Sequence, residues 1–295
     1  MKPIKHPAWR RAVTVLLAMA TALVLGTSLR AVSPPALSAQ SSYTFAGTTD
    51  WNNDGNEDII ARDINGALWL YRGQGTLTPS LLPRTQIGTG WNGYTFAGTT
   101  DWNNDGNEDI IARDINGALW LYRGQGTLTP SLLPRTQIGT GWNGYTFAGT
   151  TDWNNDGNED IIARDINGAL WLYRGQGTLT PSLLPRTQIG TGWNGYTFAG
   201  TTDWNNDGNE DIIARDINGA LWLYRGQGTL TPSLLPRTQI GTGWNGYTFA
   251  GTTDWNNDGN EDIIARDING ALWLYRGQGT LTPSLLPRTQ IGTGW

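Results

Sequence analysis

The chain contains short apolar runs separated by polar, turn-forming residues. Within its first regular segment these runs span residues 43–49, 58–63, 67–72 and, more weakly, 81–87. The two middle runs are apolar on both faces, whereas a strand with one solvated face would alternate apolar and polar positions. We therefore expect strands that are covered on both sides. No run carries a 3.6-residue apolar period long enough to predict a helix.

The residues between the runs predict how the strands connect. Asn65-Gly66 separates the second and third runs, and both residues tolerate positive φ, so a hairpin is expected there. Pro79 and Pro83 lie in or beside the fourth run. Because proline cannot donate to a strand ladder, this run suits the outer edge of a sheet.

The whole pattern repeats without a single change. A 51-residue unit opens at Tyr43 and gives five copies, the last of them two residues short, which span residues 43–93, 94–144, 145–195, 196–246 and 247–295. A fixed period near 50 residues indicates stacked supersecondary units. Four-stranded sheets that pack face to face around an axis cover both sheet faces, so the fold class predicted is all-β, a five-bladed β-propeller of identical four-stranded blades.

The ends of the repeats bear on whether the ring closes. Internal junctions read Trp91-Asn92-Gly93-Tyr94, the chain ends at Trp295, and Ser41-Ser42 precedes Tyr43. If Trp295 docks beside Ser41, a fifth junction forms and the propeller closes. The alternative is an open solenoid, which needs polar caps that identical first and last copies do not provide.

Residues 1–39 are predicted to be a signal peptide. They combine a basic start with a 15-residue apolar run from Ala12 to Gly26, followed by small residues that allow cleavage between 28 and 39. Residues 40–42 form a short linker to the propeller at 43–295. An uncleaved anchor is the alternative, and either reading places the repeats outside the cytoplasm, secreted or at the cell surface.

Composition excludes several kinds of chemistry. The chain has no cysteine, and its only histidine, His6, precedes the repeats, so disulfides, thiolate metal sites and Ser-His or Cys-His catalysis are not expected in them. Each copy carries five carboxylates and three arginines. One divalent cation per copy would balance this excess, and such an acidic surface without lysine makes nucleic acid an unsuitable partner.

The strongest chemical motif is the nonapeptide DWNNDGNED at residues 50–58 of the first copy. Oxygen-bearing side chains fall at positions 1, 3, 5 and 9, and Gly55 permits a sharp turn. Ca²⁺ prefers six to eight such oxygens, so we predict about one calcium ion per copy. The predicted ligands, with the carbonyl for each Asn at position 7, are Asp50, Asn52, Asp54, Asn56, Asp58, Asp101, Asn103, Asp105, Asn107, Asp109, Asp152, Asn154, Asp156, Asn158, Asp160, Asp203, Asn205, Asp207, Asn209, Asp211, Asp254, Asn256, Asp258, Asn260 and Asp262.

This nonapeptide resembles the calcium loops of FG-GAP/VCBS repeats, as found in integrin α-subunit propellers. The resemblance spans each whole copy, through Asp-x-Asn-x-Asp-Gly-x-x-Asp and the following Ile-Ile-Ala-Arg-Asp and Leu-Trp-Leu-Tyr. It implies a propeller and calcium ligation by these loop residues, although such propellers usually have seven blades. The alternative is a polar turn without metal, which leaves its carboxylates to repel one another.

Aromatic residues gather at the blade junctions. Trp69 is mid-strand and predicted to be core, Trp51 either covers the acidic loop or projects outward, and Arg62 with Asp63 is a possible surface pair. The Ile-Gly-x-Gly-Trp stretch resembles the junctions of tachylectin-type five-bladed lectins, which implies binding of N-acetylated sugars between blades. Aromatic rings pack on the C–H faces of sugars, and side-chain amide groups form hydrogen bonds with sugar hydroxyl groups. The candidate glycan-binding residues are Trp91, Asn92, Tyr94, Trp142, Asn143, Tyr145, Trp193, Asn194, Tyr196, Trp244, Asn245, Tyr247, Trp295 and Tyr43. The alternative is that these residues only pack one blade against the next and bind no ligand.

Three functions follow from these features. The leading hypothesis is a secreted, calcium-binding propeller that binds glycans or surface polymers at several sites at once, as a monomeric ring or a swapped oligomer. The second is a structural or adhesive module without a sugar ligand. A glycoside hydrolase is the least favoured, because identical copies cannot tune two carboxylates differently. We therefore predict a protein that is not an enzyme.

Overall fold

A computed structural model describes residues 43–77, 81–128, 132–178, 183–229, 234–280 and 285–295. The predicted signal peptide at 1–39 and linker at 40–42, including Ser41 and Ser42, lie outside these residues. The contacts within the chain group Ala39–Trp295 into one compact unit, and its described part consists of strands, turns and loops.

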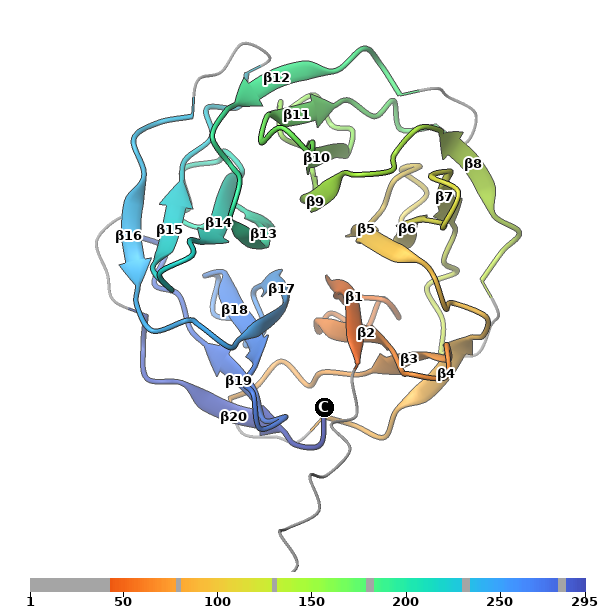
Figure 1. The fold of residues 1–295 in the computed structure, drawn as a ribbon. Coiled ribbons are helices and arrows are strands. Elements are labelled where there is room, and N and C mark those ends of the chain that lie inside the picture. Colours follow the sequence, from red (N-terminus) through yellow and green to blue (C-terminus); the bar gives the residue numbers. More distant parts are fainter. Residues whose placement is uncertain (1–42, 78–80, 129–131, 179–182, 230–233, 281–284) are drawn as a thin grey trace, which may run out of the picture. The chain divides into compact units, whose positions relative to one another are not determined.

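The unit contains five four-stranded antiparallel sheets, one for each repeat, which we call blades 1 to 5 (Figure 1). The strands are β1 (Thr44–Thr49), β2 (Asp58–Arg62), β3 (Leu68–Tyr71) and β4 (Thr85–Gly88) in blade 1; β5 (Thr95–Thr100), β6 (Asp109–Arg113), β7 (Leu119–Tyr122) and β8 (Thr136–Gly139) in blade 2; β9 (Thr146–Thr151), β10 (Asp160–Arg164), β11 (Leu170–Tyr173) and β12 (Thr187–Gly190) in blade 3; β13 (Thr197–Thr202), β14 (Asp211–Arg215), β15 (Leu221–Tyr224) and β16 (Thr238–Gly241) in blade 4; and β17 (Thr248–Thr253), β18 (Asp262–Arg266), β19 (Leu272–Tyr275) and β20 (Thr289–Gly292) in blade 5.

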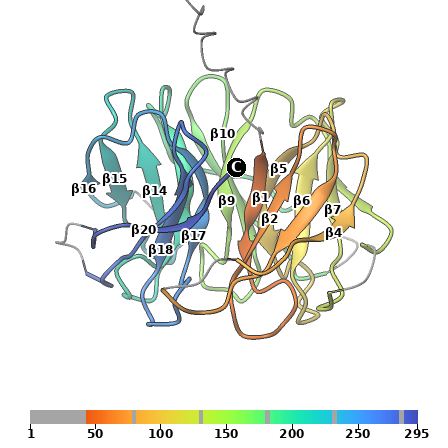
Figure 2. The same ribbon diagram turned by 90° about the horizontal axis from the view of Figure 1, so that it is seen from below.

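The predicted five-bladed β-propeller is confirmed. In every blade the strands pair in chain order, with the first strand nearest the axis and the fourth at the rim, as Figures 1 and 2 show. The fourth run of each copy is therefore the outer edge, as predicted, although Pro79 lies outside the described residues. Its strand, β4, is shorter than the predicted run and begins only after the exposed Pro83.

The turn between β2 and β3 forms where Asn65-Gly66 predicts it, with different chemistry. Only Gly66 adopts positive φ, at 83°, while Asn65 does not. The Asp63 carboxylate accepts the backbone N–H groups of Asn65 at 2.9 Å and Ala67 at 3.0 Å. It also accepts the indole N–H of Trp69 at 2.9 Å. Asp63 thus organises the turn from within and is not a surface partner of Arg62.

Burial follows the sequence pattern in the second strand. Ile59, Ile60 and Ala61 have no exposed surface. Ile60 belongs to a core cluster with Ile110 of blade 2, whereas Ile59 and Ala61 belong to a cluster with Ile264 of blade 5. The two faces of each sheet are therefore covered by two different neighbours, which is why these strands are apolar throughout.

The innermost strands close the ring through a circle of threonines. The hydroxyl of Thr99 donates to the carbonyl of Thr48 at 3.3 Å, and this contact recurs from blade to blade until Thr48 donates to Thr252 at 3.3 Å. Glycine permits the close approach, because a Cβ atom on Gly47 would lie 2.4 Å from the Thr99 hydroxyl oxygen. The first and last blades meet like any other pair.

The blade junctions are filled by tryptophan. Trp91 stacks on Phe96 of blade 2 with ring centroids 5.5 Å apart, and Trp295 stacks on Phe45 of blade 1 at the same 5.5 Å. Arg266 donates to the carbonyl of Tyr43 at 3.0 Å and so adds a polar contact across the same junction. Trp295 thus packs against the first blade and the open-solenoid alternative is wrong, while its predicted neighbour Ser41 lies outside the described residues.

Two tryptophan assignments differ from expectation. Trp51 is only 3% exposed, and its ring reaches Gly124 of blade 2, so it packs between blades rather than projecting outward. Trp69 is half-buried, and the guanidinium of Arg84 covers its ring at 3.9 Å, so it is not a core residue. Its place opposite Gln86, next to the rim of the sheet, leaves one face to be covered by a charged side chain.

We predict that Trp295→Ala lowers the free energy of unfolding by about 3–5 kcal/mol, as expected for removal of a buried tryptophan. Trp142→Ala is the matched control, because the same ring occupies an internal junction with the same neighbours. Urea unfolding of both variants measures the two losses. A loss confined to Trp142→Ala would contradict closure of the ring through Trp295.

Candidate functional site

The acidic loop between β1 and β2 is held by its own carboxylates. Asp50 accepts the backbone N–H of Asp54 at 3.0 Å and that of Gly55 at 2.8 Å, one with each oxygen. Asn53 and Gly55 adopt positive φ, at 56° and 83°, which the turn requires and which these residue types tolerate. Asp54 in turn accepts the backbone and side-chain N–H groups of Asn56 at 3.0 and 2.8 Å.

Asp58 is the buried member of the loop. It begins β2 with no exposed surface, accepts the N–H of Gly73 at 3.0 Å, and accepts the Asn52 amide at 2.9 Å. The pKa of this carboxyl is raised to about 7, chiefly by burial and also by the nearby carboxylates of Asp54 and Asp50, while its two hydrogen bonds act in the opposite direction. Three carboxylates therefore act on one another here, as the spacing of the motif predicts.

The structure also reveals a link between neighbouring loops. The side-chain amide of Asn53 donates to the carbonyl of Gly106 at 3.1 Å and to the side chain of Asn107 at 3.2 Å, both in blade 2. The same pair of bonds recurs at each junction, and Asn257 of blade 5 donates to Gly55 and Asn56 of blade 1, both at 3.2 Å. Asn53 is not a predicted site residue, because its partners lie 53 and 54 positions away.

Glutamates near the loops also interact between blades. The pKa of Glu57 is raised to about 7, chiefly by burial and also by the carboxylates of Glu108 and Glu261, while a hydrogen bond with Thr253 of blade 5 acts to lower it. Burial is also the main cause of the raised pKa values of the corresponding glutamates in the other four blades. These five glutamates, one from each acidic nonapeptide, therefore form a second acidic set whose interactions between blades the sequence motif does not reveal.

The donor chemistry of the loop fits a hard divalent cation. Asp50, Asp54 and Asp58 offer carboxylate oxygens, and the raised pKa of Asp58 shows a buried carboxyl that a nearby positive charge would favour in its ionised form. The positions of the loop side chains, in contrast, do not form a metal site in this structure. Among the residues that the structure describes, no three acidic or histidine side chains are grouped as metal ligands, and the loop carboxylates bond to the loop backbone instead.

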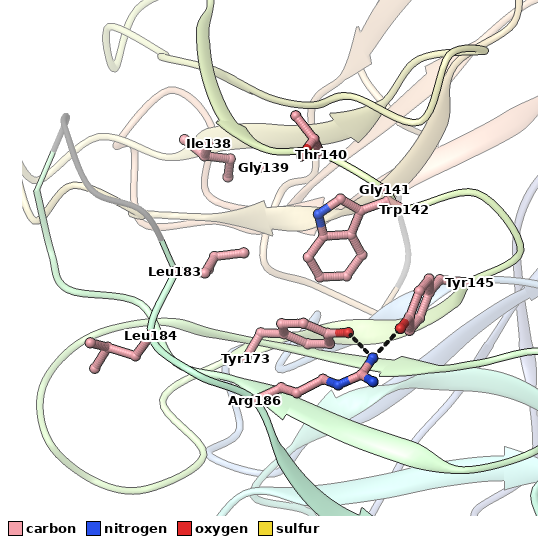
Figure 3. Close-up of a pocket in the computed structure, with 10 residues that line it drawn as sticks. All are labelled: Ile138, Gly139, Thr140, Gly141, Trp142, Tyr145, Tyr173, Leu183, Leu184 and Arg186. Atoms are coloured by element: carbon pink, nitrogen blue, oxygen red, sulfur yellow. Dashed lines mark hydrogen bonds between the residues drawn. The ribbon is translucent and has the colours of Figure 1, made fainter.

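A second candidate site lies between adjacent blades. Four equivalent pockets, of about 410–450 Å³, are found among the described residues. In the pocket of Figure 3, blade 2 contributes residues 138–142 and blade 3 contributes two tyrosines, two leucines and an arginine. These last residues are Tyr145, Tyr173, Leu183, Leu184 and Arg186. The volume falls in the range of roughly 300–1,000 Å³ that is common for small-ligand sites.

Arg186 is fixed in this pocket by aromatic partners. Its Nη1 donates to the hydroxyl of Tyr145 and, at 3.1 Å, to that of Tyr173 (Figure 3). The guanidinium carbon lies 3.9 Å from the centre of the Trp171 ring. Cation–π contact and two hydroxyl acceptors hold the charged group in one orientation at the edge of the pocket.

The candidate sugar-binding residues separate into two groups. Tyr145 lines the pocket, and so does one side of Trp142, although this indole is only 3% exposed and packs on Phe147 and Tyr173. Asn143 does not line it, since its amide lies against the turn at Gly117, where a Cβ atom would come within 2.8 Å. At the other three junctions within the chain the tryptophan and the tyrosine also line the pocket, and the asparagine again lies against a glycine turn. At the fifth junction Trp295 contacts Tyr43 and Tyr71.

Sequence reasoning missed Tyr173, Leu183 and Arg186. Tyr173 and Leu183 pack with Trp142 across a blade boundary, and Arg186 is held by Tyr145 and Tyr173, which are distant from it in sequence, so no local spacing signals these residues. The only hint is a pattern in which tyrosine ends the third strand and Leu-Leu-Pro-Arg precedes the fourth in every copy. Arg62 and its equivalents are likewise structural, since Arg164 donates to the carbonyls of Trp193 and Tyr196, both at 2.8 Å.

Comparison with known proteins identifies the repeat. The FG-GAP-like repeat matches four overlapping segments, residues 50–112, 101–163, 152–214 and 203–265, which together cover well over half of the chain. Integrin alpha-6 of Gallus gallus is 26% identical over 157 residues, an alignment that covers 47% of this chain and 15% of that protein. The chain thus spans a small part of the length of this relative.

Solved structures give only distant likenesses. Raptor of Chaetomium thermophilum has a TM-score of 0.43 and 13% identity, over 86% of this chain and 21% of that one. The Nup133 β-propeller domain of Vanderwaltozyma polyspora has a TM-score of 0.39 and 10% identity, over 84% and 71% of the two chains. These similarities carry no argument about function. Among the described residues, no helix has the length and apolar character that a membrane crossing requires.

We predict that, in the presence of a chelator, the propeller loses stability as the pH rises from 5 to 8. Asp58 has a folded pKa of about 7 against an ordinary value of 3.8, and Glu57 has a folded pKa of about 7 against an ordinary value of 4.5. The folded state therefore retains protons that the unfolded chain has released across this interval, so the free energy of unfolding falls with pH and levels off above the folded pKa.

Thermal melts in chelator at pH 5, 6, 7 and 8 test this prediction. Substitution of all five buried aspartates, in the series Asp58→Asn, removes their titration and should make the loss of stability with pH smaller, leaving the part that comes from Glu57 and its equivalents. A melting temperature that increases steadily from pH 5 to pH 8 in the unsubstituted protein would contradict it.

Proposed function

We propose that this chain, which belongs to the FG-GAP-like repeat family, is a calcium-stabilised propeller that binds extracellular glycans at several equivalent sites. The observation that carries the proposal is the repeated inter-blade pocket, which combines apolar walls with a few polar groups at each junction described. Such a combination is typical of small-ligand sites. Identical pockets around one ring suit a polymeric ligand, because each further contact is intramolecular and adds avidity.

The role of each pocket residue follows from its exposure. Trp142 is buried and supplies a wall, so contact with a sugar falls to the half-exposed Tyr145, to Leu183 and to the exposed Thr140. Tyrosine and leucine can pack on the C–H face of a pyranose, while the threonine hydroxyl can bond its hydroxyls. This proposal does not include Asn143 among the sugar contacts, because its amide lies against the turn at Gly117 and not in the pocket.

Calcium belongs to the proposal through the acidic loop. Asp50, Asn52, Asp54 and Asp58, with the carbonyl of Asn56, would hold the ion, and the corresponding residues would do so in the other blades. Bound calcium would neutralise the mutual repulsion of these carboxylates, which the raised pKa of Asp58 reflects. The side chain of Asn56 is already engaged with Asp54 and with Asn257, which leaves its carbonyl as the available group.

The proposal places the protein outside the cell, secreted or at the cell surface. The predicted signal peptide at 1–39 and the similarity to integrin alpha-6 support this location. It also assigns no catalytic centre, because every blade presents the same carboxylates in the same surroundings.

The likeness to integrin alpha-6 favours a second candidate, an adhesive propeller that binds another protein. The two functions predict different effects when the pocket is filled. Filling the pocket would abolish binding if the ligand is a sugar held there, but would leave binding intact if the partner docks elsewhere on the ring.

We predict that the chelated protein takes up about five calcium ions and melts at a higher temperature when they are bound, because a ligand that binds only the folded state stabilises it. Native mass spectrometry counts the ions, and thermal melts at pH 8 measure the shift. Asp105→Asn should remove one ion. Asp114→Asn is the matched control, since Asp114 accepts hydrogen bonds in the β6–β7 turn and lies outside the acidic loop. No uptake, or equal ion counts for both variants, would contradict calcium binding by the loop.

We predict that replacing the exposed pocket threonine by tryptophan in all five copies, the series Thr140→Trp, abolishes glycan binding by filling the pocket. The matched series Asn143→Ala should leave it unchanged, because this amide is not part of the pocket. Glycan arrays and calorimetry compare the two series with the unsubstituted protein. Equal binding by the Thr140→Trp series would exclude the pocket as the glycan site.

A further inference from the structure

We propose that each inter-blade pocket receives the carboxylate of an acidic sugar, so that the ligand is a polysaccharide rich in uronic acids. This inference rests on the proposed function and names the class of glycan. It starts from the charge of the pocket walls. In the four pockets lined by described residues, an arginine is the only lining residue that is charged at neutral pH, and no carboxylate lines them.

The arginine is held in place but not neutralised. Among the described residues Arg186 forms no ion pair, and its hydrogen bonds run from Nη1 to two neutral phenols. Asp165 is the carboxylate that acts on Arg186 electrostatically. It is occupied by the indole N–H of Trp171 and by the backbone N–H groups of Asn167 and Ala169. The pocket therefore keeps a positive charge without a close counter-ion.

The contacts of the guanidinium leave donors available for a carboxylate. Stacking on Trp171 fixes its plane, and the two phenols occupy Nη1 alone. The Nε and Nη2 groups, which have no acceptor among the described residues, form the edge that pairs with both oxygens of a carboxylate. The hydrogen bond with Tyr173 raises the pKa of Arg186, so it stays cationic at any pH the protein meets.

The rest of the pocket distinguishes a sugar acid from an acidic peptide. Leu183, Tyr145 and the edge of Trp142 give a broad apolar wall, and Thr140 gives an exposed hydroxyl opposite it. A uronic acid carries its carboxylate on a ring that has one C–H face and several hydroxyls, so all three kinds of group find a partner. An aspartate or glutamate side chain offers the carboxylate without the ring. The repetition of the pocket also matches a polymer that repeats its carboxylate.

Calorimetry with small probes tests the inference. Glucuronic acid, its methyl ester and glucose are titrated into the full ring in calcium buffer. The ester keeps the ring and hydroxyls and lacks only the charge. We expect glucuronic acid to bind about ten- to a hundred-fold more tightly than the ester, the usual range for a hydrogen bond to a charged group. Poly-glutamate serves as the peptide probe and should bind more weakly per carboxylate.

Substitution of the arginine links the effect to the pocket. The five-fold series Arg186→Gln should bring glucuronic acid down to the affinity of the ester without changing the ester itself. The series Arg186→Lys keeps the charge but loses the planar fork, and should fall between the two. If the five-fold series does not fold, the single variant Arg186→Gln should lower the number of glucuronic acid molecules bound from about five to about four, and Asn143→Ala should leave it unchanged.

The outcomes separate the two proposals. Equal affinity for the acid and its ester would overturn the carboxylate inference and leave glycan binding standing. Absence of binding by all three sugars would overturn both. Tighter binding of poly-glutamate than of glucuronic acid, lost in the Arg186→Gln series, would overturn the sugar acid in favour of an acidic peptide.

Discussion

Burial of both faces of every blade is the constraint on which this structure depends. Ile59 and Ile60 point to opposite sides of one sheet, and each is completely buried only because a different neighbour covers it. A blade alone would expose both of these apolar faces. An open row of identical repeats would therefore leave one apolar face uncovered at each end. Closure of the ring supplies the missing neighbour for the first and last blades. The pockets and acidic loops exist at fixed positions because the junctions between blades are all the same.

Much of the fold could be predicted from the sequence because its signals are local. The continuous apolar character of Ile59 to Ala61 indicates double burial, and the fixed period indicates a ring of blades. The β2–β3 turn follows from Asn65-Gly66, although only Gly66 uses positive φ. The misassigned tryptophans show the limit of local signals. Trp51 and Trp69 differ in burial because of which neighbouring blade or side chain reaches them, and no residue next to them encodes that.

The candidate sites could be predicted only in part for the same reason. The acidic loop is continuous in sequence, so Asp50, Asp54 and Asp58 are found together as their spacing predicts. The pocket is assembled from two blades, and its arginine becomes visible only when Arg186 is seen beside Tyr145. Asn143 shows the converse: it is adjacent to the junction tryptophan in sequence, but its amide lies close to Gly117 of its own blade and it is not among the residues that line the pocket.

The amide bridges from each acidic loop to the next have a consequence for any study that alters one copy. Asn53 spans the boundary to Gly106 and Asn107, and Asn257 completes the circuit back to the first blade. Every loop is thus both donor to one neighbour and acceptor from the other. Changing a single repeat perturbs three consecutive repeats, so five changes made one at a time will not sum to the effect of making them together. Chemically identical blades do not behave as independent modules.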